Sequence, residues 1–246
     1  MSKVLVLAGD QNPLKVSFFP PLELDTEYEL GLLSVHGRNV VPNITEANNC
    51  FHYDQEKQIR IPPGNYTIPE LAECLNGLLH RAHPNMIEDA QHRKVMNHNL
   101  VRLSWNPVIG RLEFMCCFRV DPKMVPFNLI KTLGFDDVIP AYKKVVAENE
   151  MRFYLNDLMR VNCDVVKGCY YNGEPTQTVH EFSCTASPGA GFEEKPPVVS
   201  YFPVCERASL SEVRATLCNQ QNVPLNLRDQ LLVIRLHLRR QNASGI

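Results

Sequence analysis

The stretch from Ile59 to Leu71 constrains the fold more than any other part of the chain. It reads Ile-Arg-Ile-Pro-Pro-Gly-Asn-Tyr-Thr-Ile-Pro-Glu-Leu. Its alternating start predicts a strand, its Pro-Pro-Gly a turn, and its end the first turn of a helix. This is the one strong helix in a sequence that otherwise has the pattern of β-strands. A β-rich chain with one well-made helix and no visible catalytic apparatus indicates a building block rather than an enzyme.

The helix carries its own start and stop signals. Thr67 and Glu70 have the spacing of a capping box, in which each side chain bonds the backbone N–H of the other residue. Pro69 lies in the first turn, where a missing N–H costs nothing. Pro84 ends the pattern near His83. One apolar face recurs at helical spacing along Ile68, Leu71, Ala72, Leu75, Leu78 and Leu79.

Short strands with frequent turn signals fill most of the remaining sequence. The clearest is Gln230–Leu238, in which Leu232 and Ile234 point to the core and Arg235 to solvent. About a dozen such segments are typical of a sandwich or barrel. We expect strands at Lys3–Leu7, Leu14–Phe19, Glu27–Val35, Cys50–Asp54, Gln58–Ile61, Leu100–Trp105, Arg111–Arg119, Met151–Leu155, Leu158–Val165, Thr178–Cys184, Val198–Val204, Leu210–Leu217 and Gln230–Leu238.

Other segments are expected to connect these strands. Phe19-Pro20-Pro21 and Glu23–Thr26 have the composition of connections, and residues 84–99 and 185–197 that of exposed loops. A second, short helix is expected at Pro126–Leu133. Gly134 would close it in a left-handed conformation, and Phe135 would pack back on it.

Charge and length exclude some classes of function. The chain has 246 residues, which fits one large all-β domain or two small ones. Its net charge of −2 argues against a nucleic-acid binder. The basic residues Arg235, Arg239 and Arg240 then belong to the solvated face of a strand. We expect no direct contact with nucleic acid.

Nine cysteines, with no C-x-x-C pair, predict free thiols in a reducing intracellular compartment, either cytoplasm or nucleus. The thiols would be buried as small hydrophobes. The first residues are too short an apolar run for a signal peptide, and no segment approaches the length of a membrane span.

Candidate catalytic and metal residues are few. No cysteine has the sequence context of a nucleophile, which needs a base and an orienting group. His80 and His83 lie one turn apart on the helix, and His92 or His98 could join them around zinc, but exposed histidines that complement the helix dipole fit better. Asp136 and Asp137 lack the spacing of a calcium loop. We therefore predict no catalytic residue, no metal and no cofactor.

The only tryptophan, Trp105, precedes an Asn-Pro turn. An aromatic ring at this place could serve as a platform for a sugar. A core residue at the end of a hairpin is the better interpretation, because tryptophan is mostly buried.

Several blocks of this sequence, in this order, resemble the penton (minor capsid) proteins of Polinton/Maverick elements and adintovirus-like viruses. The resemblance covers most of residues 14–240 and depends on the order and spacing of the blocks. They are Phe18–Pro21 with Leu24, Tyr28–Leu32, Val41–Ile44, Asn48–Phe51, Ile59–Tyr66 with its helix, Leu133–Phe135, Tyr201–Val204, Val213–Leu217, Val223–Leu225 and Leu232–Arg239.

The resemblance implies an all-β capsid protein, an antiparallel β-sandwich with a single jelly roll. Residues 1–246 would form one domain with N-terminal and loop extensions, into which the amphipathic helix is inserted, with its apolar face over a sheet edge or the end of the roll. Five copies would form a homopentamer at a vertex of an icosahedral virion or virus-like particle. Its partner there would be a double jelly-roll major capsid protein. The gene could be viral, carried by a transposable element, or domesticated by a host.

Two other functions stay open at this point. One is a β-sandwich module that binds a carbohydrate or peptide through Trp105 or Tyr170-Tyr171. The other is a cysteine-dependent hydrolase.

Overall fold

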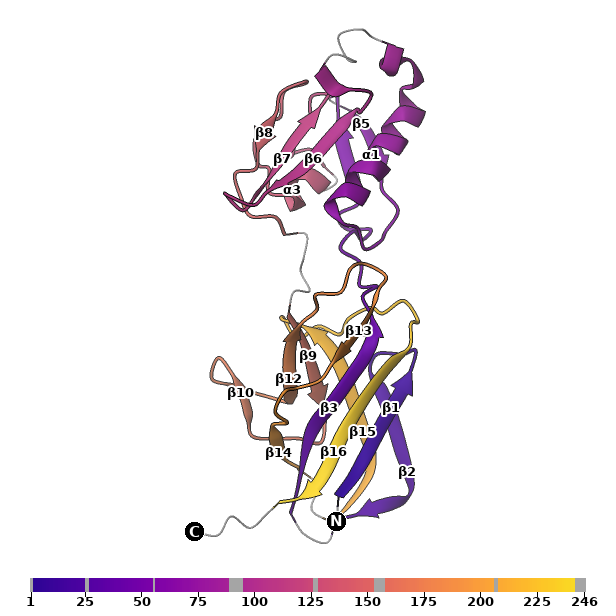
Figure 1. Ribbon diagram of the computed structural model, residues 1–246, viewed down its shortest axis with the longest axis vertical. Helices are drawn as coiled ribbons and strands as arrows, with labels where there is room; N and C mark the ends of the chain where they lie inside the picture. Colours follow the sequence, from indigo (N-terminus) through magenta and orange to yellow (C-terminus); the bar gives the residue numbers. More distant parts are fainter. Residues whose placement is uncertain are drawn as a thin grey trace. The chain divides into compact units, whose positions relative to one another are not determined.

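The computed structural model describes residues 2–24, 27–54, 56–88, 95–125, 128–152, 158–205 and 208–241. The chain divides into two compact units (Figure 1). Unit 1 comprises residues 1–41 and 156–246, and unit 2 comprises residues 42–155. Each unit is built around its own cluster of buried apolar side chains.

The first sheet of unit 1 brings the two ends of the chain together. Its order is β1 (Ser2–Gly9), β16 (Leu232–Arg240), β3 (Tyr28–Arg38) and β13 (Gly191–Glu194), with β14 (Tyr201–Pro203) also paired to β3. All pairs are antiparallel. β16 therefore lies between β1 and β3, and it is the strand that joins β1 to the rest of this sheet.

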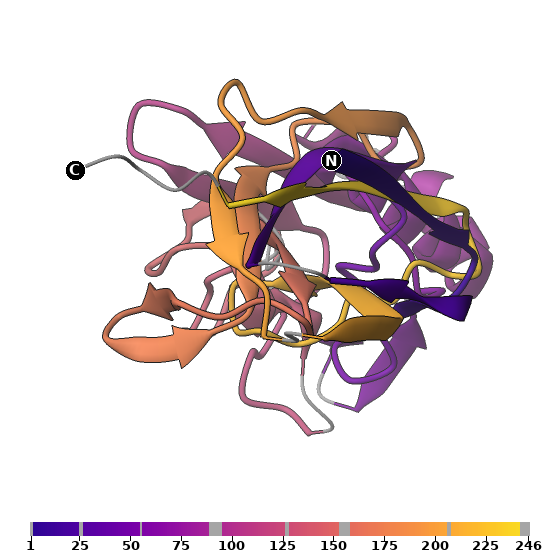
Figure 2. The same cartoon turned by 90° about the horizontal axis from the view of Figure 1, so that it is seen from below.

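The second sheet of unit 1 has four antiparallel strands. Its order is β12 (Thr178–Ser183), β9 (Leu158–Cys163), β15 (Ser209–Asn219) and β2 (Leu14–Glu23). A hairpin of β10 (Cys169–Tyr171) and β11 (Glu174–Thr176) lies between β9 and β12 in the sequence. Figure 2 shows β1 and β16 in one layer and β2 and β15 in the other.

Unit 1 is a jelly roll. Along the chain, β1, β3, β13 with β14, and β16 belong to the first sheet, and β2, β9, β12 and β15 to the second. Except for the paired strands β9 and β12, and with β13 and β14 taken as one, successive strands of the two sheets cross from one sheet to the other, as in the double Greek key of a jelly roll. The predicted fold class, an antiparallel sandwich with a single jelly roll and two helices, is confirmed.

Alternation of side chains builds the core of the sandwich. In β16, Leu232, Ile234, Leu236 and Leu238 are completely buried while Arg235 is exposed, as the sequence pattern predicts. In β3, Tyr28, Leu30 and Leu32 are buried, and in β15 so are Val213, Ala215 and Leu217. All of these side chains belong to the apolar cluster of unit 1.

Unit 2 leaves the jelly roll after β3 and returns before β9. It contains hairpin β4 (Cys50–Tyr53) with β5 (Lys57–Arg60), and the sheet β6 (Val101–Asn106), β7 (Arg111–Cys116) and β8 (Val145–Val146). Its helical elements are α1 (Ile68–Ala82), the short 3₁₀ helix η1 (Pro84–Glu88) and α3 (Leu129–Thr132).

The capping box that begins α1 is present. The Glu70 N–H donates to Thr67 Oγ1 over 3.4 Å, and the Thr67 N–H donates to Glu70 Oε2 over 2.7 Å. These bonds hold the pKa of Glu70 below its ordinary value. Leu71, Leu75 and Leu79 are completely buried in the cluster of unit 2. The helix therefore packs within its own unit, beside β6, and its apolar face is covered by the cluster of unit 2.

The second helix is shorter than predicted. It begins after the N-cap Asn128, whose side chain accepts from the Ile130 N–H, and residues 126–127 of the predicted range lie outside the described residues. Gly134 does have a positive φ, of 95°. A Cβ at this position would lie 2.4 Å from the Asn149 carbonyl oxygen, so only glycine fits. Phe135 packs back as expected, completely buried.

Several predicted connections are wrong. β2 continues through Pro20 and Pro21, because it is an edge strand and its register with β15 shifts at this place. The loop expected at 185–197 contains β13, and residues 84–99 contain η1 and the buried Met96. Residues 151–152 are not a strand, and the rest of the strand predicted at Met151–Leu155 lies outside the described residues. The description of residues 1–246 as one domain stays a prediction.

Leu75→Asp tests how far unit 2 depends on the face of α1. A carboxylate at this completely buried position has no partner and costs several kcal/mol. We expect the substitution to abolish the folding of unit 2 and assembly together, seen as loss of hydrogen-exchange protection in α1, β6 and β7. A soluble, assembling Leu75→Asp protein would show that the helix is peripheral.

Gly77→Ala is the matched control on the same helix. Gly77 is exposed, and a Cβ there meets nothing within 4 Å. This substitution should raise the unfolding free energy by about 0.5–1 kcal/mol, because alanine loses less backbone entropy in a helix.

Candidate functional site

Of the histidines near the end of α1, which the sequence predicts to be exposed, His80 and His83 are half-buried, and His83 has a structural role. His83 Nε2 lies 2.9 Å from the Tyr53 hydroxyl, and its ring packs on Phe118 at 4.6 Å. Burial lowers the pKa of His83, which keeps the ring neutral. His92 lies outside the described residues. Within the described part of the chain, no three His, Cys, Asp or Glu side chains gather closely enough to hold a metal ion.

The nine cysteines are all free thiols. Five are buried, as predicted, but Cys205 is exposed. Burial raises the pKa of Cys163 to about 12. Burial raises the pKa of further thiols too, those of Cys50, Cys74, Cys116, Cys169, Cys184 and Cys218. A nucleophilic cysteine needs the opposite shift, so none of these seven thiols is activated as a nucleophile.

Asp136 and Asp137 are both exposed, as expected of a turn. Asp136 Oδ2 accepts from Asn149 Nδ2 over 2.6 Å, and the Asp136 N–H donates to Glu148 Oε2 over 3.0 Å. These bonds fasten the turn after Gly134 to residues 148–149. Asp136 therefore has a structural role.

Trp105 is not a core residue. Its side chain is 45% exposed at the end of β6, so the prediction that it would be buried is wrong. Val108, at 90% exposure, and Ile109, at 49%, follow in the turn to β7. Exposure is shared by its neighbour in the strand: Ser104 is exposed too, so the outer part of β6 lies beyond the apolar cluster of unit 2. The result is an apolar, aromatic tip on this hairpin.

Two hollows are lined by residues that the structure describes. One, of about 210 Å³, lies over β6 and β7, where Glu113 accepts from Ser104 and Asn106 and pairs with Lys144 at 2.7 Å. The other, of about 300 Å³, has Phe182 and Phe192 among its lining residues, from β12 and β13. Ligand pockets usually span about 300–1,000 Å³, so the first hollow is below this range and the second is at its lower limit.

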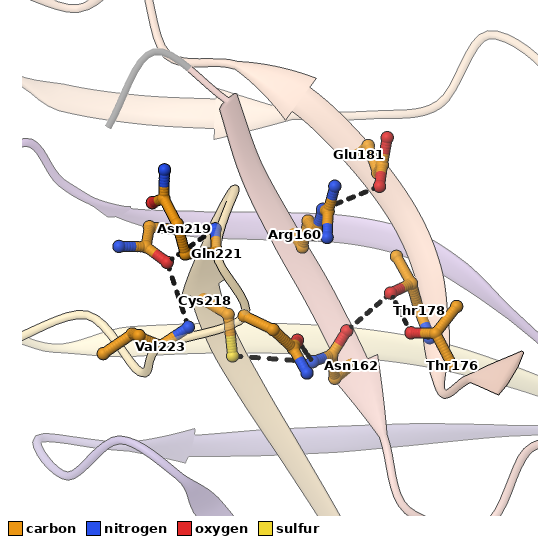
Figure 3. A network of polar contacts seen from close by, with 10 residues as sticks. Arg160, Asn162, Thr176, Thr178, Glu181, Cys218, Asn219, Gln221 and Val223 are labelled. Atoms are coloured by element: carbon orange, nitrogen blue, oxygen red, sulfur yellow. Dashed lines mark hydrogen bonds and ion pairs between the residues drawn. The ribbon is translucent and has the colours of Figure 1, made fainter. Parts of the chain in front are cut away.

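A network of polar side chains crosses the second sheet of unit 1 (Figure 3). Asn162 on β9 accepts from the Thr178 hydroxyl on β12 over 2.9 Å and donates to Asn222 Oδ1 over 2.5 Å. Asn219, at the end of β15, accepts from the N–H groups of Gln221 and Val223. The network joins three strands and the turn after β15, so it stabilises the sheet.

Arg160 is the one charged residue that is buried among those described, at 3% exposure. Its Nε lies 2.8 Å from Glu181 Oε1 on the neighbouring strand β12 (Figure 3). The Tyr171 ring covers the guanidinium at 3.6 Å, a cation–π contact that fastens the β10–β11 hairpin to the sheet. Tyr170, beside it, is 70% exposed. The sequence pattern gives no sign of the burial of Arg160, because an isolated arginine in a strand has the pattern of a solvated position.

The basic residues at the end of β16 are partly neutralised. Arg239 Nε lies 2.6 Å from Glu29 Oε1 on β3, and its guanidinium stacks on Tyr201 at 3.4 Å. Arg235 is exposed on the outer face of the same strand. The exposure of Arg235 and Arg240 agrees with the prediction that these basic residues belong to the solvated face of a strand. No helix in the part of the chain that the structure describes is long and apolar enough to cross a bilayer.

Comparison with known proteins supports the fold. A scan against protein-family models finds no match, and no curated protein matches the sequence. Among solved structures, the chain is similar to the selenomethionine-labelled mavirus penton protein, with a TM-score of 0.51 and 10% sequence identity. The similarity covers 97% of this chain and 99% of that chain, so it includes residues of both units. At this identity the likeness concerns the fold, which is penton-like.

Glu181→Ala tests the role of Arg160. The substitution leaves a buried guanidinium without its carboxylate, which should lower the unfolding free energy by about 1–3 kcal/mol. Chemical denaturation measures this change. Glu174→Ala, on the exposed strand β11 of the hairpin, is the control and should stay within about 0.5 kcal/mol of the parent. Equal effects of the two substitutions would contradict a buried ion pair.

Proposed function

We propose that this protein is a structural component of a virus capsid: a penton, or minor capsid protein, that forms homopentamers at the vertices of an icosahedral shell. The observation that carries the proposal is the jelly-roll order of strands, with unit 2 between β3 and β9, together with similarity to the mavirus penton protein over nearly the whole of both chains. We assign no catalytic activity, metal or cofactor to it.

The ordered sequence blocks, from Phe18–Pro21 to Leu232–Arg239, favour the penton proteins of Polinton/Maverick elements and adintovirus-like viruses as its relatives. Its partner in the shell would then be a double jelly-roll major capsid protein. The protein would be made in the cytoplasm or nucleus and end in the virion. Free thiols at all nine cysteines suit synthesis in a reducing compartment. The small net charge of −2 suits a shell component that does not itself bind the genome.

The arrangement of its polar groups supports a structural role. Three of the charged side chains described above form ion pairs within the protein: Arg160 with Glu181, Arg239 with Glu29, and Lys144 with Glu113. Seven thiols have raised pKa values, so the hydrolase hypothesis has no activated nucleophile among them. What the surface offers instead is sheet edges and exposed apolar side chains, which suit assembly.

The test is the mass of the particle in solution. Five copies of a 28.0 kDa chain give about 140 kDa, which mass photometry resolves from the monomer. We expect a species of this mass, with five-fold symmetric images after negative staining. Monomers only, at high concentration and in the presence of the major capsid protein, would contradict the proposal.

One observation favours a second function, a binding module. Trp105, Val108 and Ile109 form an exposed apolar tip on the β6–β7 hairpin, and Tyr170 is exposed on another hairpin. A glycan array with clear hits that disappear in a Trp105→Ala or Tyr170→Ala protein, without any oligomer, would favour this function over the first.

A further inference from the structure

The strand β1 has an unusually unprotected edge. It lies at one end of its sheet and pairs only with β16 among the described strands. On its outer face Val4 is 57% exposed and Val6 is 52% exposed. Its eight residues contain no proline, no register shift and one charge, Lys3. A long, flat, apolar edge strand of this kind is a site where another chain can associate.

The edge strands elsewhere in the sandwich carry the protections that β1 lacks. β2 has Pro20 and Pro21 and a shift in register with β15. β12 has a shift in register with β9 between Thr178 and His180. The other edge of the first sheet is divided into two short strands, β13 and β14, and the second contains Pro203. Proline, irregular register and short length all blunt a sheet edge, so β1 stands apart as the edge left open.

The opposite edge of the same sheet presents its own apolar group. Val198, in the connection between β13 and β14, is 80% exposed. Its neighbour Val199 is anchored, because a Cβ at Gly31 would lie only 2.5 Å from Val199 Cγ1. The connection is thus fixed to β3 by Val199 while Val198 projects to solvent. We refer to β13, β14 and Val198 as the β13–β14 edge.

The two edges differ in charge. Lys3 lies within β1, and Arg235 lies beside Val6 as its cross-strand partner on β16. The β13–β14 edge carries Glu193 and Glu194. Within its own copy Glu193 pairs with Lys195 and His36 and is also attracted by Arg235, and Glu194 pairs with His180, so the difference in charge is small. Charges of this kind fix the orientation and rate of association more than its strength.

We propose that the β1 edge of one copy binds the β13–β14 edge of a second copy of this chain. The two surfaces are different and lie at opposite edges of one sheet, so the contact is head-to-tail, and repetition of it closes a ring when the rotation divides the circle. Val4 and Val6 of one copy pack against Val198 of the next. This inference rests on the proposed function and names the surfaces that join the copies.

Two variants, separately and mixed, test the inference. The Val4→Glu/Val6→Glu variant has a blocked β1 edge and an intact β13–β14 edge. The Val198→Glu variant has an intact β1 edge and a blocked β13–β14 edge. Each alone should shift the midpoint of assembly to at least about tenfold higher concentration, because each loses one side of every contact. An equimolar mixture retains one working contact per pair and should stop at a dimer of two 28.0 kDa chains, about 56 kDa.

Controls separate assembly from folding. Val4→Thr/Val6→Thr keeps β-branched side chains of similar shape, so it should fold and still weaken assembly. Val223→Glu changes a valine of 55% exposure in the turn after β15, at neither edge, and should assemble like the parent. Thermal unfolding of each variant shows that the sandwich is intact.

The other outcomes overturn the inference in distinguishable ways. If Val198→Glu dimerises alone and the β1 variant does not, the contact pairs β1 with β1. If the parent forms rings and both variants form the same rings, the copies join elsewhere or β1 binds another capsid protein, and the proposed function stands without this interface. If the parent is monomeric under all conditions, the inference and the proposed function fail together.

Discussion

The insertion of β16 between β1 and β3 is the interaction on which the rest of the structure depends. Its leucines and Ile234 are completely buried, and its backbone bonds join the first residues of the chain to the last. The chain between β3 and β16 therefore leaves this sheet and returns to it. Residues 42–155 do so between β3 and β9, and they are built around an apolar cluster of their own.

Much of this could be predicted from local sequence pattern. The alternation in Leu232–Leu238 and the capping box of Thr67 and Glu70 are local signals, and both have the predicted geometry. Features that depend on distant partners could not be predicted. The prolines of β2 are tolerated because the register between β2 and β15 shifts at this place. β13 is a strand because it pairs with β3. The apolar face of α1 packs in the cluster of unit 2, beside β6. Trp105 was misplaced because burial at the end of a strand depends on what lies beyond it.

The candidate site residues also separate into those with a local sequence signal and those that depend on distant partners. The prediction of no catalytic or metal site rests on the absence of nucleophile, zinc and calcium motifs in the sequence. The structure adds a physical reason for particular residues: His83 bonds Tyr53, and burial raises the pKa of Cys163 and of six other thiols. Arg160 and the open edge of β1 could not be recognised in the sequence, because a buried arginine and an exposed valine in a strand have no local signature. An open sheet edge such as that of β1 is a place where another chain can associate.

The central claim is that the jelly roll closes through β16 around a core separate from that of unit 2. Native-state hydrogen exchange on a Leu236→Ala protein tests it most directly. The cavity should lower the protection of amides in β1, β3 and β16 by about 2–5 kcal/mol, although these strands are far apart in sequence. Amides of α1, β6 and β7 should keep the protection they have in the parent protein. An equal loss of protection in both groups would show that the chain has one shared core and would contradict the account.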